Sequence, residues 1–381
     1  MGNLQEELER AKDLFKKQEY EDAEKIFNAV LKELKTIGIP DPELKSEAIL
    51  GVGGCLREQL YFEEAIPYYE EVLRLSPDNR KALMGMADSY RGLKDWDKAL
   101  VYWFKLIEQN PGDYLVCTRI ADAYRKKNDF GNSEKYYLMS LQINPKNKFA
   151  LMGIGDLYYK NKKYQKALEY WKKLLEINPK FINILTMIGN IYRTWKQFDK
   201  AIDSYQKALE IDRNNFYALY GIADCLRGKG RFRDAIKYWK KILSKEPNND
   251  RILTRLGDCY IRLGKFEEAE KVYQEVLANN SNKYAIIGMT RIFVETKNWP
   301  KAIEICKDYL TKYPNDSRMV LLLAKIYEDS GDPDNSMEVY EQYKHIFASR
   351  KDFTSRLASS TIESFENDID EFHSEDDHGN I

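Results

Sequence analysis

Residues 145–179 read PKNKFALMGIGDLYYKNKKYQKALEYWKKLLEINP, and this stretch decides the fold. Its apolar residues recur at the i, i+3, i+4 and i+7 spacing of a helix, first from Leu151 and again from Ala167. The polar turn 160–163 separates the two stripes. Pro179 ends the second helix, because proline lacks a backbone donor and clashes with the preceding turn. The stretch therefore predicts a helical hairpin.

The same pattern returns every 34 residues along the chain. The prolines are Pro77, Pro111, Pro145, Pro179, Pro247 and, after a one-residue deletion, Pro314. The small residues of the second helices are Ala65, Ala99, Ser133, Ala167, Ala201, Ala235, Ala269, Ala302 and Ser336. The aromatics three places before them are Phe62, Trp96, Phe130, Tyr164, Phe198, Phe232, Phe266 and Trp299. With Tyr20 and Ala23 upstream of an insertion around Ile37–Pro42, the chain holds ten repeats.

Each repeat also has a small residue in its first helix, such as Gly53, Ala87 and Gly155. We expect these residues to let two helix backbones approach closely, with the alanines of the second helix as their partners. A single hairpin cannot bury its own apolar face, so the repeats must stack on their neighbours. The pattern predicts an all-α solenoid.

The repeat resembles the tetratricopeptide repeat (TPR) over roughly residues 4–348. In the sixth repeat the matching residues are Leu185, Ile188, Gly189, Tyr192, Ala201 and Tyr205. The resemblance implies an all-α, right-handed superhelical α-solenoid of about ten TPR helical hairpins, with a concave groove that binds peptides. We expect a first repeat with its inserted loop, repeats two to ten, a C-terminal capping segment and an acidic tail, at 1–45, 46–348, 349–362 and 363–381.

Composition limits the function. The chain has 60 Lys and Arg against 61 Asp and Glu, which argues against a general nucleic-acid or membrane-coating protein. No apolar run reaches the roughly 18 residues of a membrane helix, and the N-terminus has no apolar signal region. The five cysteines form no C-x-x-C pair, which fits a reducing compartment. We expect a cytoplasmic chain without membrane insertion.

The sequence contains few residues in arrangements that are typical of catalytic sites. The chain has three histidines, His345, His373 and His378, and none precedes the last repeat. Glycine clusters fall inside first helices and not between a strand and a helix, where a phosphate-binding loop would need them. We therefore predict no enzyme, no cofactor and no metal site.

The candidate binding residues lie one and four places after the small residue of each first helix, on the face that the TPR resemblance assigns to the groove. The first ladder is Asp88, Asp122, Asp156, Asn190, Asp224 and Asp258. The second is Arg57, Arg91, Arg125, Arg193 and Arg227, with Tyr159 in the fifth repeat. The aromatic candidates beside them are Phe149, Tyr217 and Tyr220. Two interpretations stay open: Arg forks and Asp side chains bind a protein or peptide partner, or they pair with each other as solvated ion pairs.

Rival functions are also open. Asn190, Arg251 and Arg255 match three positions of the TPR clamps that bind chaperone tails, whereas Thr186 and Gly221 do not. A solenoid that binds single-stranded RNA would use Arg on phosphates and Tyr on bases. The Asp residues beside Arg argue against it, because carboxylates repel the phosphate backbone. Open-ended solenoids can also stack on each other, so self-association is a further candidate.

The C-terminal tail is acidic. Residues 363–381 carry eight acids and no Lys or Arg, so the rest of the chain is net positive. One hypothesis is a short helix that covers the last repeat, followed by a disordered end. The other is an amphipathic segment that binds a groove, either the Arg-lined one of this chain or one on a partner.

Overall fold

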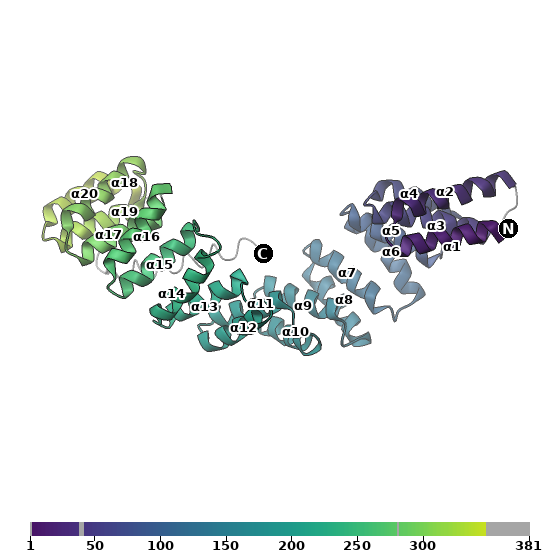
Figure 1. Ribbon diagram of the computed structural model, residues 1–381, viewed down its shortest axis with the longest axis horizontal. Coiled ribbons are helices and arrows are strands. Elements are labelled where there is room, and N and C mark those ends of the chain that lie inside the picture. The colour runs from purple at the N-terminus through teal and green to yellow at the C-terminus, as the bar shows by residue number, and fades with distance from the viewer. Residues whose placement is uncertain (1, 38–41, 280–281, 348–381) are drawn as a thin grey trace. The chain divides into compact units, whose positions relative to one another are not determined.

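The computed structural model describes residues 2–37, 42–279 and 282–347, which form helices joined by short turns (Figure 1). The first helices of the repeats are α1 (Gly2–Lys16), α3 (Pro42–Glu58), α5 (Arg80–Gly92), α7 (Tyr114–Lys126), α9 (Lys148–Lys160), α11 (Ile182–Thr194), α13 (Phe216–Gly228), α15 (Asp250–Arg262), α17 (Lys283–Glu295) and α19 (Ser317–Asp329). The second helices are α2 (Tyr20–Ile37), α4 (Phe62–Leu75), α6 (Trp96–Gln109), α8 (Phe130–Ile143), α10 (Tyr164–Ile177), α12 (Phe198–Ile211), α14 (Phe232–Leu243), α16 (Phe266–Asn279), α18 (Trp299–Lys312) and α20 (Pro333–Phe347). The all-α prediction of ten hairpins is confirmed for these residues.

Local sequence sets the helix ends. Every aromatic residue of the predicted ladder is the first residue of its second helix, from Phe62 to Trp299. Seven of the first helices begin after an Asn or Asp whose side chain accepts a backbone N–H of the first turn, which satisfies a donor that the helix itself leaves unpaired. These caps are Asn79, Asp113, Asn147, Asn215, Asn249, Asn282 and Asp316.

The turn inside each hairpin passes through one residue of positive φ. In the third repeat this residue is Lys94, whose N–H donates to the Arg91 carbonyl while Asp95 N–H donates to the Tyr90 carbonyl. A left-handed residue is the usual way to end a helix, and it costs a non-glycine residue roughly 1–2 kcal/mol. The residues are Gln18, Leu60, Lys94, Asn128, Lys162, Lys196, Gly230, Gly264, Lys297 and Gly331.

The chain divides between Ile191 and Tyr192 into two compact units. Helix α3 begins at Pro42, and the domain bounds stay a prediction. The predicted capping segment and acidic tail lie outside the described residues, and the two hypotheses for the tail stay predictions.

In repeats two to eight, a large buried aromatic lies four places after the small residue of the second helix. Tyr and Trp alternate at this position, so the structural period is two repeats, or 68 residues. All seven are nearly or fully buried: Tyr69, Trp103, Tyr137, Trp171, Tyr205, Trp239 and Tyr273.

Glycines in the first helices make room for these rings. A methyl group on Gly155 would lie 2.2 Å from the Trp171 indole nitrogen, and one on Gly257 would lie 2.5 Å from the Tyr273 ring. The following repeat contributes a second glycine to each Tyr, as Gly85 does at Tyr69. The partner of these glycines is therefore an aromatic ring, and not the alanine that the sequence predicted.

We expect Gly85→Ala to lower the free energy of unfolding by about 1 kcal/mol. The new methyl would lie 2.3 Å from the Tyr69 ring, and overpacking costs about 1–3 kcal/mol, while alanine gains about 1 kcal/mol over glycine in a helix. Gly131→Ala in α8 is the control, because its methyl meets only Asp129 Oδ1 at 3.9 Å and should stabilise. Urea denaturation measures the free energy of unfolding of both variants. A change of the same sign in the two would contradict the packing argument.

Candidate functional site

Within each compact unit, the two ladder residues of a repeat lie three places apart on one side of the first helix, here called the first-helix face. On this face Asp88 of α5 is 8% exposed and is surrounded by three guanidinium groups. Arg91 follows it on the same helix, with Nε 3.4 Å from the carboxylate. Arg57 reaches it from α3 at 4.0 Å, and Arg119 contacts it from α7. One carboxylate thus joins three successive repeats.

The same arrangement recurs four repeats later around Asp224 of α13. Its carboxylate lies 2.7 Å from Arg193 of α11 and 3.1 Å from both Arg227 of α13 and Arg255 of α15. The Asp224 side chain is 13% exposed and Arg255 only 2%. Burial alone would raise the pKa of Asp224, but the three guanidinium groups outweigh it and hold that pKa well below the usual range of aspartate.

In two other repeats a tyrosine hydroxyl caps the ladder carboxylate. The Tyr137 hydroxyl donates to Asp122, which also lies 3.1 Å from Arg125. The Tyr273 hydroxyl donates to Asp258 over 2.6 Å, and burial raises the pKa of Asp258. These are repeats whose core aromatic is Tyr, whereas Asp88 and Asp224 belong to Trp repeats.

Asp156 in the fifth repeat differs from both groups. It belongs to a Trp repeat, yet no ion pair forms at its half-buried carboxylate within the part of the chain that the structure describes. Burial raises the pKa of Asp156 to about 6, which the charge of Arg125 and a hydrogen bond from Trp171 offset only in part. Tyr159 stands where Arg91 and Arg227 stand in their repeats, and its ring centroid lies 5.5 Å from that of Trp171.

The structure separates the three aromatic candidates. Phe149 is 70% exposed and Tyr217 is 59% exposed, whereas Tyr220 is buried at 6%. The expectation of an exposed ring therefore fails for Tyr220, because Trp239 packs against its ring at 5.2 Å. Sequence reasoning missed Leu115, which is 45% exposed and, like Phe149 and Tyr217, stands seven places before a ladder residue.

The sequence analysis also missed Arg119 as a ladder partner and gave Arg255 a different role. Both stand three places before a ladder residue, and this shared repeat position was a signal that could have found them. Arg255 is almost fully buried on Asp224, and the chaperone-tail alternative stays a prediction. Asn190 lies half-buried at the ladder position of α11.

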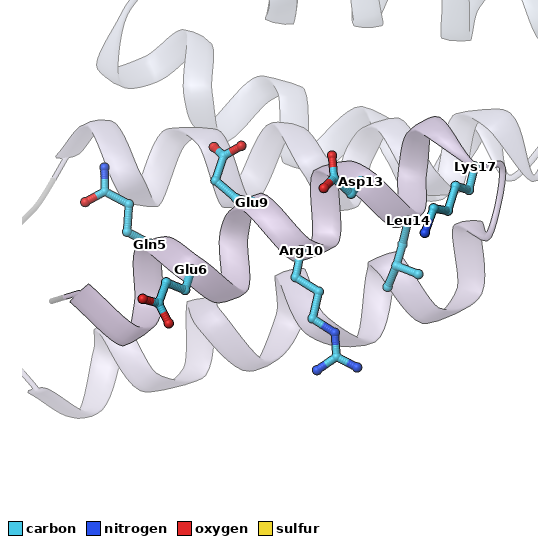
Figure 2. Close-up of a pocket in the computed structure, with 7 residues that line it drawn as sticks. All are labelled: Gln5, Glu6, Glu9, Arg10, Asp13, Leu14 and Lys17. Atoms are coloured by element: carbon cyan, nitrogen blue, oxygen red, sulfur yellow. The ribbon is translucent and has the colours of Figure 1, made fainter.

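Surface hollows lie elsewhere. One, of about 680 Å³, lies along α1, where polar side chains such as Glu9, Arg10 and Asp13 project from a single helix (Figure 2). Another, of about 450 Å³, lies between α18, α19 and α20 beside Leu310 and Tyr327. Neither includes a ladder residue.

The cysteines are placed for packing. All five are buried and unpaired, and burial raises the pKa of each thiol to about 11 or 12. At neutral pH these groups are protonated and weak nucleophiles. The cytoplasmic location inferred from the cysteines stays a prediction.

Across residues 2–37, 42–279 and 282–347, no helix combines the length and the apolar character that a membrane crossing requires. Within the same ranges, no cluster of His, Cys, Asp and Glu has the arrangement of a metal site.

Comparisons with known proteins agree with this architecture. Several TPR family profiles match the chain, at residues 56–114, 114–147, 149–181, 182–215, 226–292 and 317–344. A TPR protein from Parabacteroides merdae is 19% identical, with a TM-score of 0.45 over 65% of this chain and 98% of that one. YrrB, a TPR protein with an unusual peptide-binding site, is 19% identical, with a TM-score of 0.44 over 48% and 95%. Human IFIT1, solved as a dimer with m7Gppp-AAAA, is 18% identical, with a TM-score of 0.38 over 89% and 81%.

A search of curated proteins gave no match. The family profiles together match most of the chain, in the register of the helical hairpins that the structure shows. The chain therefore belongs to the tetratricopeptide repeat family.

Proposed function

We propose that this chain is a non-enzymatic scaffold that binds a peptide or protein segment along the first-helix face. The observation that carries the proposal is the exposed apolar side chain seven places before the ladder residue. Leu115 and Phe149 occupy this position in the first compact unit, and Tyr217 occupies it in the second. Large apolar groups held on rigid helices and surrounded by charge are typical of the energetic centre of an interface.

The charged ladders support this role because their ion pairs hold the arginine side chains in place before a partner binds. Arg57, Arg193 and Arg227 are mostly covered and point at carboxylates, so their rotamers are fixed before a partner arrives. Fixed side chains lose less entropy on binding. Arg91 keeps 53% of its side chain exposed while it contacts Asp88, so it can also meet a carboxylate of the partner.

The proposal predicts that joint replacement of Phe149 and Tyr217 by Ala weakens peptide binding at least about tenfold, because truncation of a central aromatic costs about 1–2 kcal/mol or more. Peptides are first selected from a random display library on the full chain. Each selected peptide is then labelled, and its affinity for the variant is measured by fluorescence anisotropy.

Tyr61 and Tyr313 provide the matched control. They are 53% and 46% exposed but lie in turns, away from the ladder positions. Their joint replacement by Ala should leave affinity within about twofold. Equal losses for the two double variants would refute the first-helix face as the binding site. Tight binding of a single-stranded RNA probe with a steep salt dependence would instead favour the nucleic-acid rival.

A further inference from the structure

The fifth repeat contains an incomplete copy of the ion cluster found in the third and seventh. Asp88, Asp156 and Asp224 are separated by two repeats each and precede a buried Trp of the second helix. Around Asp88 and Asp224, three arginines of this chain complete the cluster. The corresponding residues for Asp156 are Arg125, Tyr159 and Met187. Two of the three cations are therefore missing from the sequence at this position.

The remaining arginine serves another carboxylate. Arg125 donates through Nη2 to Asp122 over 3.1 Å and through Nε to the Tyr137 hydroxyl over 3.1 Å. Its attraction for Asp156 acts at longer range and does not compensate for the burial of that carboxyl. Asp122 adds a like charge nearby. Asp156 is thus a half-buried carboxylate without an ion pair among the described residues, and its charge is only partly compensated by Arg125 and by a hydrogen bond from Trp171.

The groups beside Asp156 suit a planar cation. Tyr159 replaces an arginine and packs its ring against those of Tyr164 and Trp171, at centroid distances of 5.4 and 5.5 Å. Phe149, two turns earlier on the same helix, is 70% exposed. Aromatic faces attract Arg and Lys, and a guanidinium stacks on them while its N–H groups bind a carboxylate.

Resting on the proposed function, we infer that Asp156 accepts an arginine side chain of the bound peptide or protein, which fills the place taken by the chain's own arginines at Asp88 and Asp224. The partner then carries an arginine next to an apolar residue that contacts Phe149. Burying an ion pair in this way is favourable because the carboxylate is already desolvated before the partner binds.

The first test uses the selected peptides. Replacing the arginine by citrulline, which keeps the shape and removes the charge, should weaken binding to the wild-type chain about ten- to hundredfold. With Asp156→Asn the same replacement should cost less than about threefold. With Tyr159→Arg, which places an arginine of this chain at the position of Arg91 and Arg227, the affinity of the arginine peptide should fall at least about tenfold.

Asp199→Asn is the control, because Asp199 lies outside both ladders, on α12, with 83% of its side chain exposed. It should preserve the full citrulline effect. An equal citrulline effect in wild type and Asp156→Asn would overturn the inference. In that case the proposed function still stands if the peptides depend on Phe149 and Tyr217, so the two failures are distinguishable.

Dependence on pH gives a second readout. Arg125 and Asp122 face Asp156 from α7, and Trp171 faces it from α10. Affinity for the arginine peptide should rise about tenfold between pH 5 and pH 7 as the carboxyl with a pKa of about 6 ionises. In Asp156→Asn it should stay flat, and a rise of the same size in that variant would contradict the inference.

A direct titration needs no selected peptide. N-acetyl-arginine amide is added to the full chain, and the Asp156 carboxyl resonance is followed by NMR across pH. We expect the arginine probe to lower the pKa of Asp156 and the citrulline analogue to leave it unchanged. If neither probe changes that titration, the inference is wrong, whatever the peptide selection yields.

Discussion

Asp224→Asn should destabilise the second compact unit by about 3–5 kcal/mol, the usual cost of removing one partner from a buried ion pair. The carboxylate lies within 3.1 Å of three arginines, of which Arg255 is 2% exposed. The asparagine has the same shape but no charge. Three guanidinium groups would then repel one another in a site where water cannot screen them.

The loss of stability in Asp224→Asn should be confined to the helices around the cluster and should depend on pH. Because the pKa of Asp224 is lowered in the folded chain, its contribution is fully present above the unfolded value near 4 and disappears as pH falls below it. Amide hydrogen exchange in α11, α13 and α15 should rise at pH 7, and the difference from wild type should narrow below about pH 4.

Asp199→Asn is the control for that experiment. Asp199 pairs with Lys229, but its side chain is 83% exposed. Exposed pairs contribute about 0–1 kcal/mol. Similar changes in the two variants would show that the three arginines do not depend on the Asp224 charge.

Asp156→Asn should have the opposite effect and stabilise the first compact unit by about 2–3 kcal/mol at pH 7. Burial raises the pKa of Asp156 to about 6, so the fold opposes the ionised form. Each pKa unit corresponds to about 1.4 kcal/mol. Replacement by a neutral amide of the same shape removes this penalty.

The stability change in Asp156→Asn should also depend on pH in the opposite sense to that in Asp224→Asn. A raised pKa contributes stability that is present below the unfolded value and is lost as pH rises through the folded one. The gain from Asp156→Asn should therefore be absent below about pH 4, grow up to about pH 6 and stay constant above it. Urea denaturation at several pH values measures this gain, and a destabilised variant at pH 7 would contradict the view that burial outweighs the groups that favour the charged form of Asp156.

Much of the fold could be predicted because it is local and repeated. The aromatic ladder marks the first residue of each second helix, as at Trp96 and Tyr164. A proline follows each of several second helices at a fixed distance, as Pro77 follows α4. Ten repetitions make such signals strong even where one repeat departs from the pattern.

The site was less predictable because it depends on contacts between repeats. Asp88, Asp122 and Asp156 look alike in sequence, yet one is held by three arginines, one is capped by a tyrosine and one has no ion pair among the described residues. The difference arises from residues 31 places away, such as Arg57 and Arg119. A reading of single helices considers only neighbours three and four places apart.

The three-arginine clusters also have a mechanical meaning. An array in which each repeat contacts only its neighbours can come apart one repeat at a time from either end. Arg57, Asp88 and Arg119 belong to three successive repeats, so releasing one of them weakens the hold on the other two. Under tension, we expect the three repeats around Asp88 to unfold together in one larger step and not one after another.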